Sequence, residues 1–187
     1  MRIRTNDILG RTALGLLVLF AACRRKPPVP VAEQRSETIP DQTLGTFTMD
    51  SYLGALRQWS LKSPHADLFD QEHRVDVASP QVRFFNAGQA GSTVNAAQGR
   101  LDTGTNDFWV GGGVVLASTD GVHLESDWVR YEKSADRFVS TAPVTVTRGR
   151  SIVKGVGWEA RSDLSDMVIR DQRGEIAPED NRLMKNK

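Results

Sequence analysis

Several features that would indicate a function directly are scarce in this chain of 187 residues. It contains a single cysteine, so no disulfide can form within one chain. No apolar run reaches eighteen residues, which excludes a protein with several membrane-spanning helices. Its 24 basic and 23 acidic side chains nearly cancel, whereas nucleic-acid-binding domains carry a surplus of positive charge. What remains is a small soluble domain with an apolar segment near its N-terminus.

Side chains suited to catalysis are also few. The sequence has no HxH or HxxxH spacing, which is typical of metal sites, among its three histidines, His65, His73 and His123. The three glycines at 111–113 lack the following Lys-Ser/Thr of a phosphate-binding loop, so they indicate a bulge or turn. No nucleophile with a partnered base can be assembled. We therefore expect no enzymatic activity, no metal site and no cofactor.

The first 22 residues have the form of a secretory signal, with arginines at 2, 4 and 11 ahead of an apolar stretch over 13–22. That stretch ends in Phe-Ala-Ala followed by Cys23, which resembles the lipobox of bacterial lipoproteins, in which the cysteine carries the lipid. The alternative is an uncleaved single-pass anchor, although the stretch is short for a hydrocarbon core of about 30 Å. Both interpretations place the rest of the chain outside the cytoplasm and attached to a membrane.

Composition divides the remainder into three parts. Residues 23–42 are polar and contain three closely spaced prolines, which is typical of an extended tether. Residues 43–177 are expected to form one β-rich domain, because apolar segments alternate with Gly, Asp and Asn turns. A short helix or irregular lead-in is expected only over 52–59. Residues 178–187 form a polar tail that begins at a proline.

An internal repeat organises the domain. Four segments share a bulky residue, a small residue two positions later, another residue at +5 and a bulky one at +7, although the fourth is looser; they start at Leu61, Val94, Leu124 and Val153. A second strand follows each at a fixed offset, and in three of them a Pro or Gly breaks that strand. Positions 0 and +2 have opposite parity to +5 and +7, so all four can point inward only if the strand bends between them. The sequence thus predicts an all-β fold in which repeats of about 30 residues wrap two antiparallel sheets around a shared apolar interior.

These segments resemble the LptC family, the periplasmic component of the lipopolysaccharide export machine. The resemblance runs over about 44–176 and rests on the order and spacing of several pieces: Trp59-x-Leu61-x-Ser63-x-x-Ala66, Val75-x-Val77-x-x-Pro80-x-Val82-x-Phe84-Phe85, Gly113-Val114-Val115, Leu124-x-Ser126-x-x-Val129-x-Tyr131 and Ile152-Val153-Lys154-Gly155. The related soluble bridge family, LptA, shares the repeats but lacks a membrane attachment, so the N-terminal segment favours LptC. Family members usually carry one transmembrane helix, from which the lipobox of this chain departs.

The resemblance implies an open β-jellyroll that holds the acyl chains of lipopolysaccharide between its two sheets. The inward motif positions would line this trough: Val94, Leu101, Phe108, Val110, Leu124, Tyr131, Phe138, Val153 and Met167. It also implies partners at the unpaired end strands. The transporter subunits of the inner membrane would dock at the first strands, marked by Leu61 and Leu68, and an LptA-like bridge at the last, marked by Met167, Ile169 and Ile176. The expected location is the periplasmic face of the inner membrane, with the outer membrane as the alternative.

One competing interpretation comes from the same repeats. A β-repeat lipoprotein could serve as an envelope scaffold whose core is closed and filled by its own side chains. The interior of the domain distinguishes the carrier from the scaffold, because a carrier needs an apolar space that lipid can enter.

Overall fold

The computed structural model describes residues 39–175, and this part of the chain is almost entirely β-structure. The strands are β1 (Gln42–Leu44), β2 (Phe47–Leu53), β3 (Leu56–Ser63), β4 (His65–Phe69), β5 (Arg74–Ala78), β6 (Gln81–Asn86), β7 (Gln89–Asn95), β8 (Gln98–Asp102), β9 (Phe108–Ser118), β10 (Val122–Glu132), β11 (Arg137–Arg148), β12 (Ser151–Arg161), β13 (Met167–Ile169) and β14 (Arg173–Glu175). Two single turns of 3₁₀ helix, η1 (Asp70–Glu72) and η2 (Lys133–Ala135), join strands. The predicted lipidation site at Cys23, the predicted signal and C-terminal tail, and most of the predicted tether lie outside the described residues.

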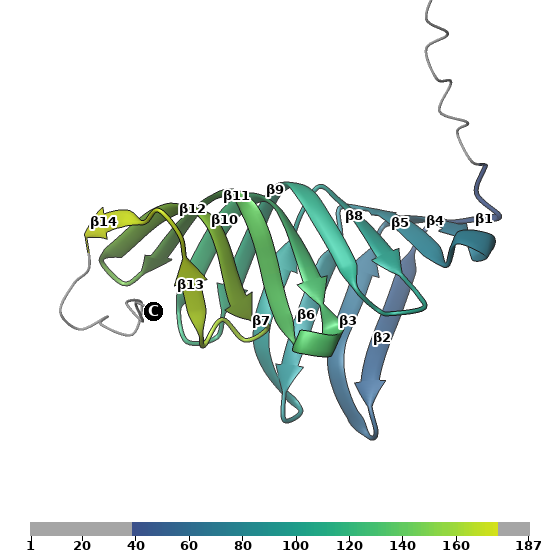
Figure 1. Cartoon of the computed structure of the whole chain (residues 1–187). Coiled ribbons are helices and arrows are strands. Elements are labelled where there is room, and N and C mark those ends of the chain that lie inside the picture. The colour runs from purple at the N-terminus through teal and green to yellow at the C-terminus, as the bar shows by residue number, and fades with distance from the viewer. Residues whose placement is uncertain (1–38, 176–187) are drawn as a thin grey trace, which may run out of the picture. The chain divides into compact units, whose positions relative to one another are not determined.

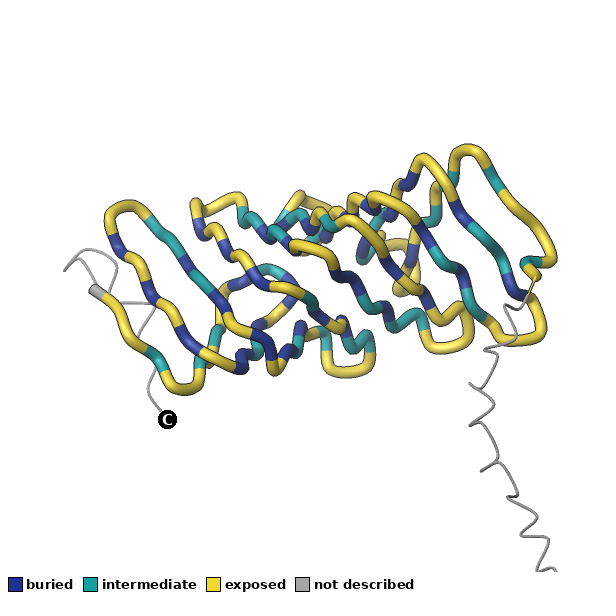
Figure 2. The backbone as a smooth tube through the Cα atoms, turned by 90° about the horizontal axis from the view of Figure 1, so that it is seen from above, coloured by how far each residue is buried: buried dark blue, intermediate teal, exposed yellow. Residues whose placement is uncertain are grey.

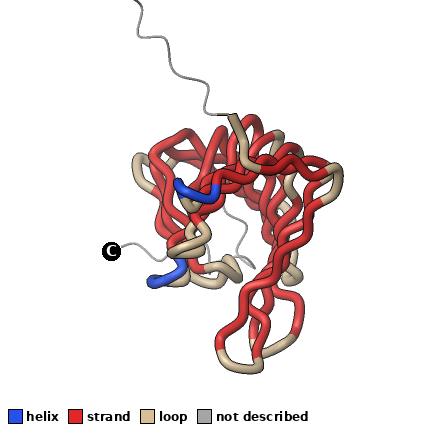
Figure 3. The backbone as a smooth tube through the Cα atoms, turned by 90° about the vertical axis from the view of Figure 1, so that its right-hand side faces the viewer, coloured by secondary structure: helices blue, strands red, loops and turns tan. Residues whose placement is uncertain are grey.

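All strand pairs are antiparallel, and the strands form one sheet folded into two layers (Figure 1). Layer A contains β1, β4, β5, β8 and β13, together with the halves of β9, β10, β11 and β12 that pair with this set. Layer B contains β2, β3, β6, β7, β14 and the other halves of the same four long strands. Seen from the β1 end, the layers meet along the top and diverge below it (Figure 3). This is the open β-jellyroll that the repeats predicted.

The long strands β9, β10, β11 and β12 each cross the corner between the layers. The shorter strands do so as consecutive pairs: β1 with β2, β3 with β4, β5 with β6, β7 with β8, and β13 with β14. The predicted break in parity is present, because the pairing of the long strands shifts after Ser126 and between Ser140 and Pro143. On β9 the bend uses Gly112 and Gly113, whose φ angles of 82° and 85° suit glycine. Bulges and prolines therefore turn the chain from one layer into the other.

The core lies between the layers and includes inward residues of both. Along most strands buried residues alternate with exposed ones, which appears as alternating colours along the tube in Figure 2. The largest fully buried side chains are Trp59, Trp158, Tyr131, Phe84, Phe138, Leu61, Leu101, Leu116 and Leu124. Side chains from strands far apart in the sequence thus share one apolar interior.

The two ends of the described sheet carry strands that are paired on one side. β1 and β2 lie at the N-terminal end, and β13 and β14 lie at the C-terminal end. The prediction that Leu61 and Leu68 mark edge strands is wrong. β3 pairs with both β2 and β6, and β4 pairs with both β1 and β5, so both residues are interior to the sheet. Ile176 lies outside the described residues, whereas Met167 and Ile169 do lie in the edge strand β13.

This correction has a simple structural origin at residues 52–59. The expected short helix or lead-in is instead the turn and flanking strands of the β2–β3 hairpin. Gly54, with a φ of 61°, forms its tip. The hairpin adds one further bent strand before β3 and moves the N-terminal edge to β1 and β2.

Candidate functional site

The apolar interior is the candidate site, and the sequence predicted many of its members. Of the nine residues expected to line it, eight are at most 2% exposed. They are Val94, Leu101, Phe108, Val110, Leu124, Tyr131, Phe138 and Val153. Met167 is half-buried and packs against the same core. The inward orientation deduced from parity therefore matches their burial, whereas lipid contact by these residues remains a prediction.

An aromatic cluster fills the middle of the interior. Phe84 approaches Tyr131, Phe138 and Phe108, with ring centroids 4.8, 5.1 and 6.0 Å apart. Phe84 belongs to layer B, whereas the other three rings come from the layer A halves of their strands. Trp59, also from layer B, meets Phe108 edge-on at 6.1 Å. The cluster therefore holds the two layers together.

Phe84 and Trp59 were absent from the predicted lining. The sequence does indicate Phe84, because Phe84 lies two positions after Val82, and both follow Pro80, the proline between β5 and β6. Trp59 precedes the repeat motif by two positions and therefore shares its inward face. Extending the motif by one alternation in each direction would have found both.

Most polar groups of this site lie at its margins, whereas the Trp59 indole N–H is buried in the interior without a hydrogen-bond partner among the described residues. The Tyr131 hydroxyl donates to Asp136 Oδ1 at 3.2 Å, close to η2. Burial, and then the negative charge of Asp136, raises the pKa of Tyr131, so the phenol remains protonated and can donate. At the corner, Trp158 Nε1–H donates to Ser126 Oγ at 3.2 Å, and that hydroxyl donates to the Pro143 carbonyl at 2.8 Å. These bonds satisfy buried polar atoms and leave a largely apolar surface between them.

The apolar interior reaches both ends of the sheet. Half-buried Phe47, Met49 and Leu68 pack on the core near the N-terminal edge strands. Half-buried Met167 and Ile169 do the same on β13. A neighbouring domain placed at either edge could therefore continue both the strand ladder and the apolar interior.

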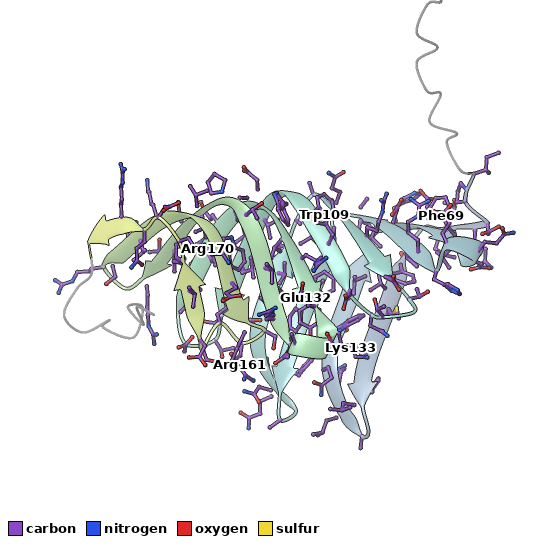
Figure 4. All side chains as sticks on the ribbon, viewed as in Figure 1. Phe69, Trp109, Glu132, Lys133, Arg161 and Arg170 are labelled. Atoms are coloured by element: carbon purple, nitrogen blue, oxygen red, sulfur yellow. The ribbon has the colours of Figure 1, made fainter. Side chains whose placement is uncertain are left out.

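The outer face of layer A is chemically different. A pocket of about 820 Å³ there is lined by residues that include His65, Asp67, Asp76, Arg100 and Trp109. Arg100 Nε donates to Asp76 Oδ1 at 2.8 Å, and His65 Nε2 lies 3.4 Å from Asp67 Oδ2. Figure 4 shows Trp109 on this face. Its charged side chains are paired with one another, and apolar residues such as Val77 and Ala97 complete the lining.

A second charged group lies where β10 meets η2. Glu132 forms ion pairs with Arg130 and Arg137, and the hydrogen bonds from these arginines hold its pKa below the ordinary value. Figure 4 shows Glu132 beside Lys133 at this rim of layer A. Within residues 39–175, no group of three or more acidic, His or Cys side chains could hold a metal ion. The same part of the chain contains no helix long and apolar enough to span a membrane.

The sequence matches a model of a known protein family. A family model described as lipopolysaccharide-assembly, LptC-related matches residues 12–176, which is most of the chain. No curated protein matches the sequence significantly.

Proposed function

Because the chain belongs to the LptC family of lipopolysaccharide-assembly proteins, and so acts in lipopolysaccharide transport, we propose that it is a carrier between two other components. It accepts lipopolysaccharide from the inner-membrane ABC transporter and passes it to an LptA-like bridge. Its acyl chains lie between layers A and B during this transfer. The domain stays at the periplasmic face of the inner membrane, attached through lipidated Cys23 or an N-terminal anchor.

The observation that carries the proposal is an apolar interior that extends to an edge strand at each end. The half-buried residues Phe47 and Met167 lie at these two ends. Each methylene moved from water into such an interior contributes about 0.8 kcal/mol, so acyl chains need no specific polar partner. The sugars and phosphates stay in water, on the side where the layers diverge.

The edge strands provide the partner sites. β1 and β2 would pair with the transporter's periplasmic domains, and β13 and β14 would pair with the bridge by strand addition. A photo-crosslinking residue at Val168, which is 37% exposed on β13, should capture the bridge protein. The same residue at Glu125, on the exposed face of β10, should not. Equal capture at both positions would contradict docking at the C-terminal edge.

The scaffold alternative has one observation in its favour, which is the close packing of the aromatic cluster. Residues such as Phe138, at 0% exposure, can contact lipid only after the layers separate or side chains move. The test therefore uses half-buried interior positions, where a larger side chain fits more easily.

A photo-crosslinking residue is placed at Phe47 or Met167, with Glu125 as the outer-face control. The full chain is expressed in its own envelope and irradiated. Lipopolysaccharide adducts at both interior positions, and none at Glu125, are expected for a carrier. A folded, correctly localised protein without an adduct at either interior position would contradict the carrier function and favour the scaffold.

A further inference from the structure

The loop between β12 and β13, residues 162–166, crosses from layer A to layer B on the side where the layers diverge. We call this loop the clasp. The buried Ser92 hydroxyl on β7 donates to the Ser162 carbonyl, and Asn86 Nδ2 at the end of β6 donates to Asp163 Oδ2 at 3.2 Å. Figure 1 shows the loop below β13 running toward β7. At this point the open side of the jellyroll is bridged.

The clasp also places a side chain in the interior. Leu164 is 4% exposed and belongs to the hydrophobic cluster that contains most of the predicted lining residues. Unlike them, it comes from a loop and not from a strand. Its φ of 60° lies in the left-handed region, which is unfavourable for leucine. Burial of the side chain thus holds the loop in a backbone conformation that the residue would not otherwise prefer.

The hydrogen bonds that cross the open side are separate from the strand ladder. They use the side chains of Ser92, Asn86 and Asp163, whereas β13 is held to β12 through backbone pairing at 158–160. Asp163 Oδ1 also accepts the Ser165 N–H at 2.9 Å, which shapes the loop. Releasing the clasp from layer B would therefore leave both layers intact.

A lipid carried in the proposed way has its acyl chains inside and its sugars outside. Such a molecule moves along the domain with its headgroup passing between the diverging edges of the layers. The clasp crosses this path between the N-terminal edge and β13. We propose that the clasp is a gate for lipid passage: it must detach from β6 and β7, withdrawing Leu164, before an acyl chain can reach the C-terminal end. This inference rests on the carrier function proposed above.

A disulfide across the open side tests the gate. A Cβ added at Gly91 would lie 3.6 Å from the Cβ of Asp163. This separation falls within the range of about 3.5–4.5 Å seen in disulfides, so Gly91→Cys with Asp163→Cys should lock the clasp to β7. The matched control is Arg83→Cys with Thr93→Cys, a directly opposed pair on β6 and β7 that does not cross the open side.

Lipid passage is read from the photo-adducts at Phe47 and Met167 in intact envelopes, with and without reductant. In the locked variant we expect the Phe47 adduct to persist and the Met167 adduct to be lost, and reductant to restore it. The control pair should keep both adducts. A Met167 adduct that persists in the oxidised locked variant overturns the gate. Loss at both positions also overturns it, because the N-terminal half should load without the clasp opening.

The outcomes distinguish a failure of the gate proposal from a failure of the proposed carrier function. If the protein without the engineered disulfide gives no lipopolysaccharide adduct at Phe47 or Met167, the carrier function itself is contradicted, together with the gate that rests on it. Leu164→Gly supplies an independent variant, because glycine accepts the left-handed backbone while removing the side chain from the interior. We expect it to increase the Met167 adduct while leaving the Phe47 adduct unchanged. An unchanged Met167 adduct would contradict the role of Leu164.

Discussion

Replacing Phe84 with alanine removes the ring through which layer B meets three rings of layer A. Phe84 is 2% exposed and lies 4.8 Å from Tyr131, 5.1 Å from Phe138 and 6.0 Å from Phe108, measured between ring centroids. Truncating a buried phenylalanine typically lowers the free energy of unfolding by about 3–5 kcal/mol. We expect a value toward the upper end, because edge-to-face ring pairs contribute roughly 0.5–1.5 kcal/mol each.

Urea unfolding of the purified protein, followed by tryptophan fluorescence, measures this loss. Trp59 and Trp158 are buried at 0% and 1% exposure, so their emission reports on the interior. Ile152→Ala is the control, because that side chain is 45% exposed and its removal should change stability by less than about 0.5 kcal/mol. A loss below about 1 kcal/mol for Phe84→Ala, with an unchanged urea dependence, would refute close packing between the layers.

Three further predictions follow from individual contacts. Ser126→Ala should lower the free energy of unfolding by about 1–3 kcal/mol, because the buried Trp158 N–H loses its acceptor; unchanged stability in urea would contradict this. Gly155→Ala would place a Cβ under 3.0 Å from the Ile169 side chain, so hydrogen exchange should accelerate in β13 and remain unchanged in β4. The pKa of Glu132 lies below its ordinary 4.5, so the native state holds this proton less tightly than the unfolded state. The stabilisation that ionised Glu132 provides is therefore fully present above about pH 4.5, and it is lost as the pH falls through the native pKa of Glu132. Glu132→Gln should remove this part of the acid dependence when urea midpoints are compared between about pH 6 and pH 2, and an unaltered profile would count against it.

The bends between the layers were predictable because each bend changes the pattern of apolar residues along the sequence. A strand that turns a corner must change the parity of its inward positions, and Pro80 and Pro143 stand where the chain leaves one layer for the other. The same parity identified residues that are in fact buried. A period-two pattern is dictated by the pleat itself, so it survives in a single sequence.

The edges and the clasp were not predictable in this way. Tyr52, Leu53 and Leu56 are exposed apolar residues whose spacing imitates a helical face, which concealed the hairpin turn at Gly54. Leu164 is buried from a loop, where no periodicity indicates which way a side chain points. Whether a strand is paired on one side or on both is likewise a property of the assembled sheet, so it cannot be predicted from the residues of that strand alone.

The passage of every bent strand through both layers restricts how the molecule can deform. The chain crosses the corner at each of β9, β10, β11 and β12. The two layers are therefore covalently continuous along this corner and cannot slide past each other. Once the clasp and the aromatic cluster between the layers separate, the motion that remains is a change in the angle between the layers, which widens the open side while the strand ladder stays paired. In the proposed carrier, the length of the space between the layers is thus set by the number of strands, whereas its width follows the angle between the layers. If the domain carries lipid as proposed, a lipid with more acyl chains would require a larger angle between the layers.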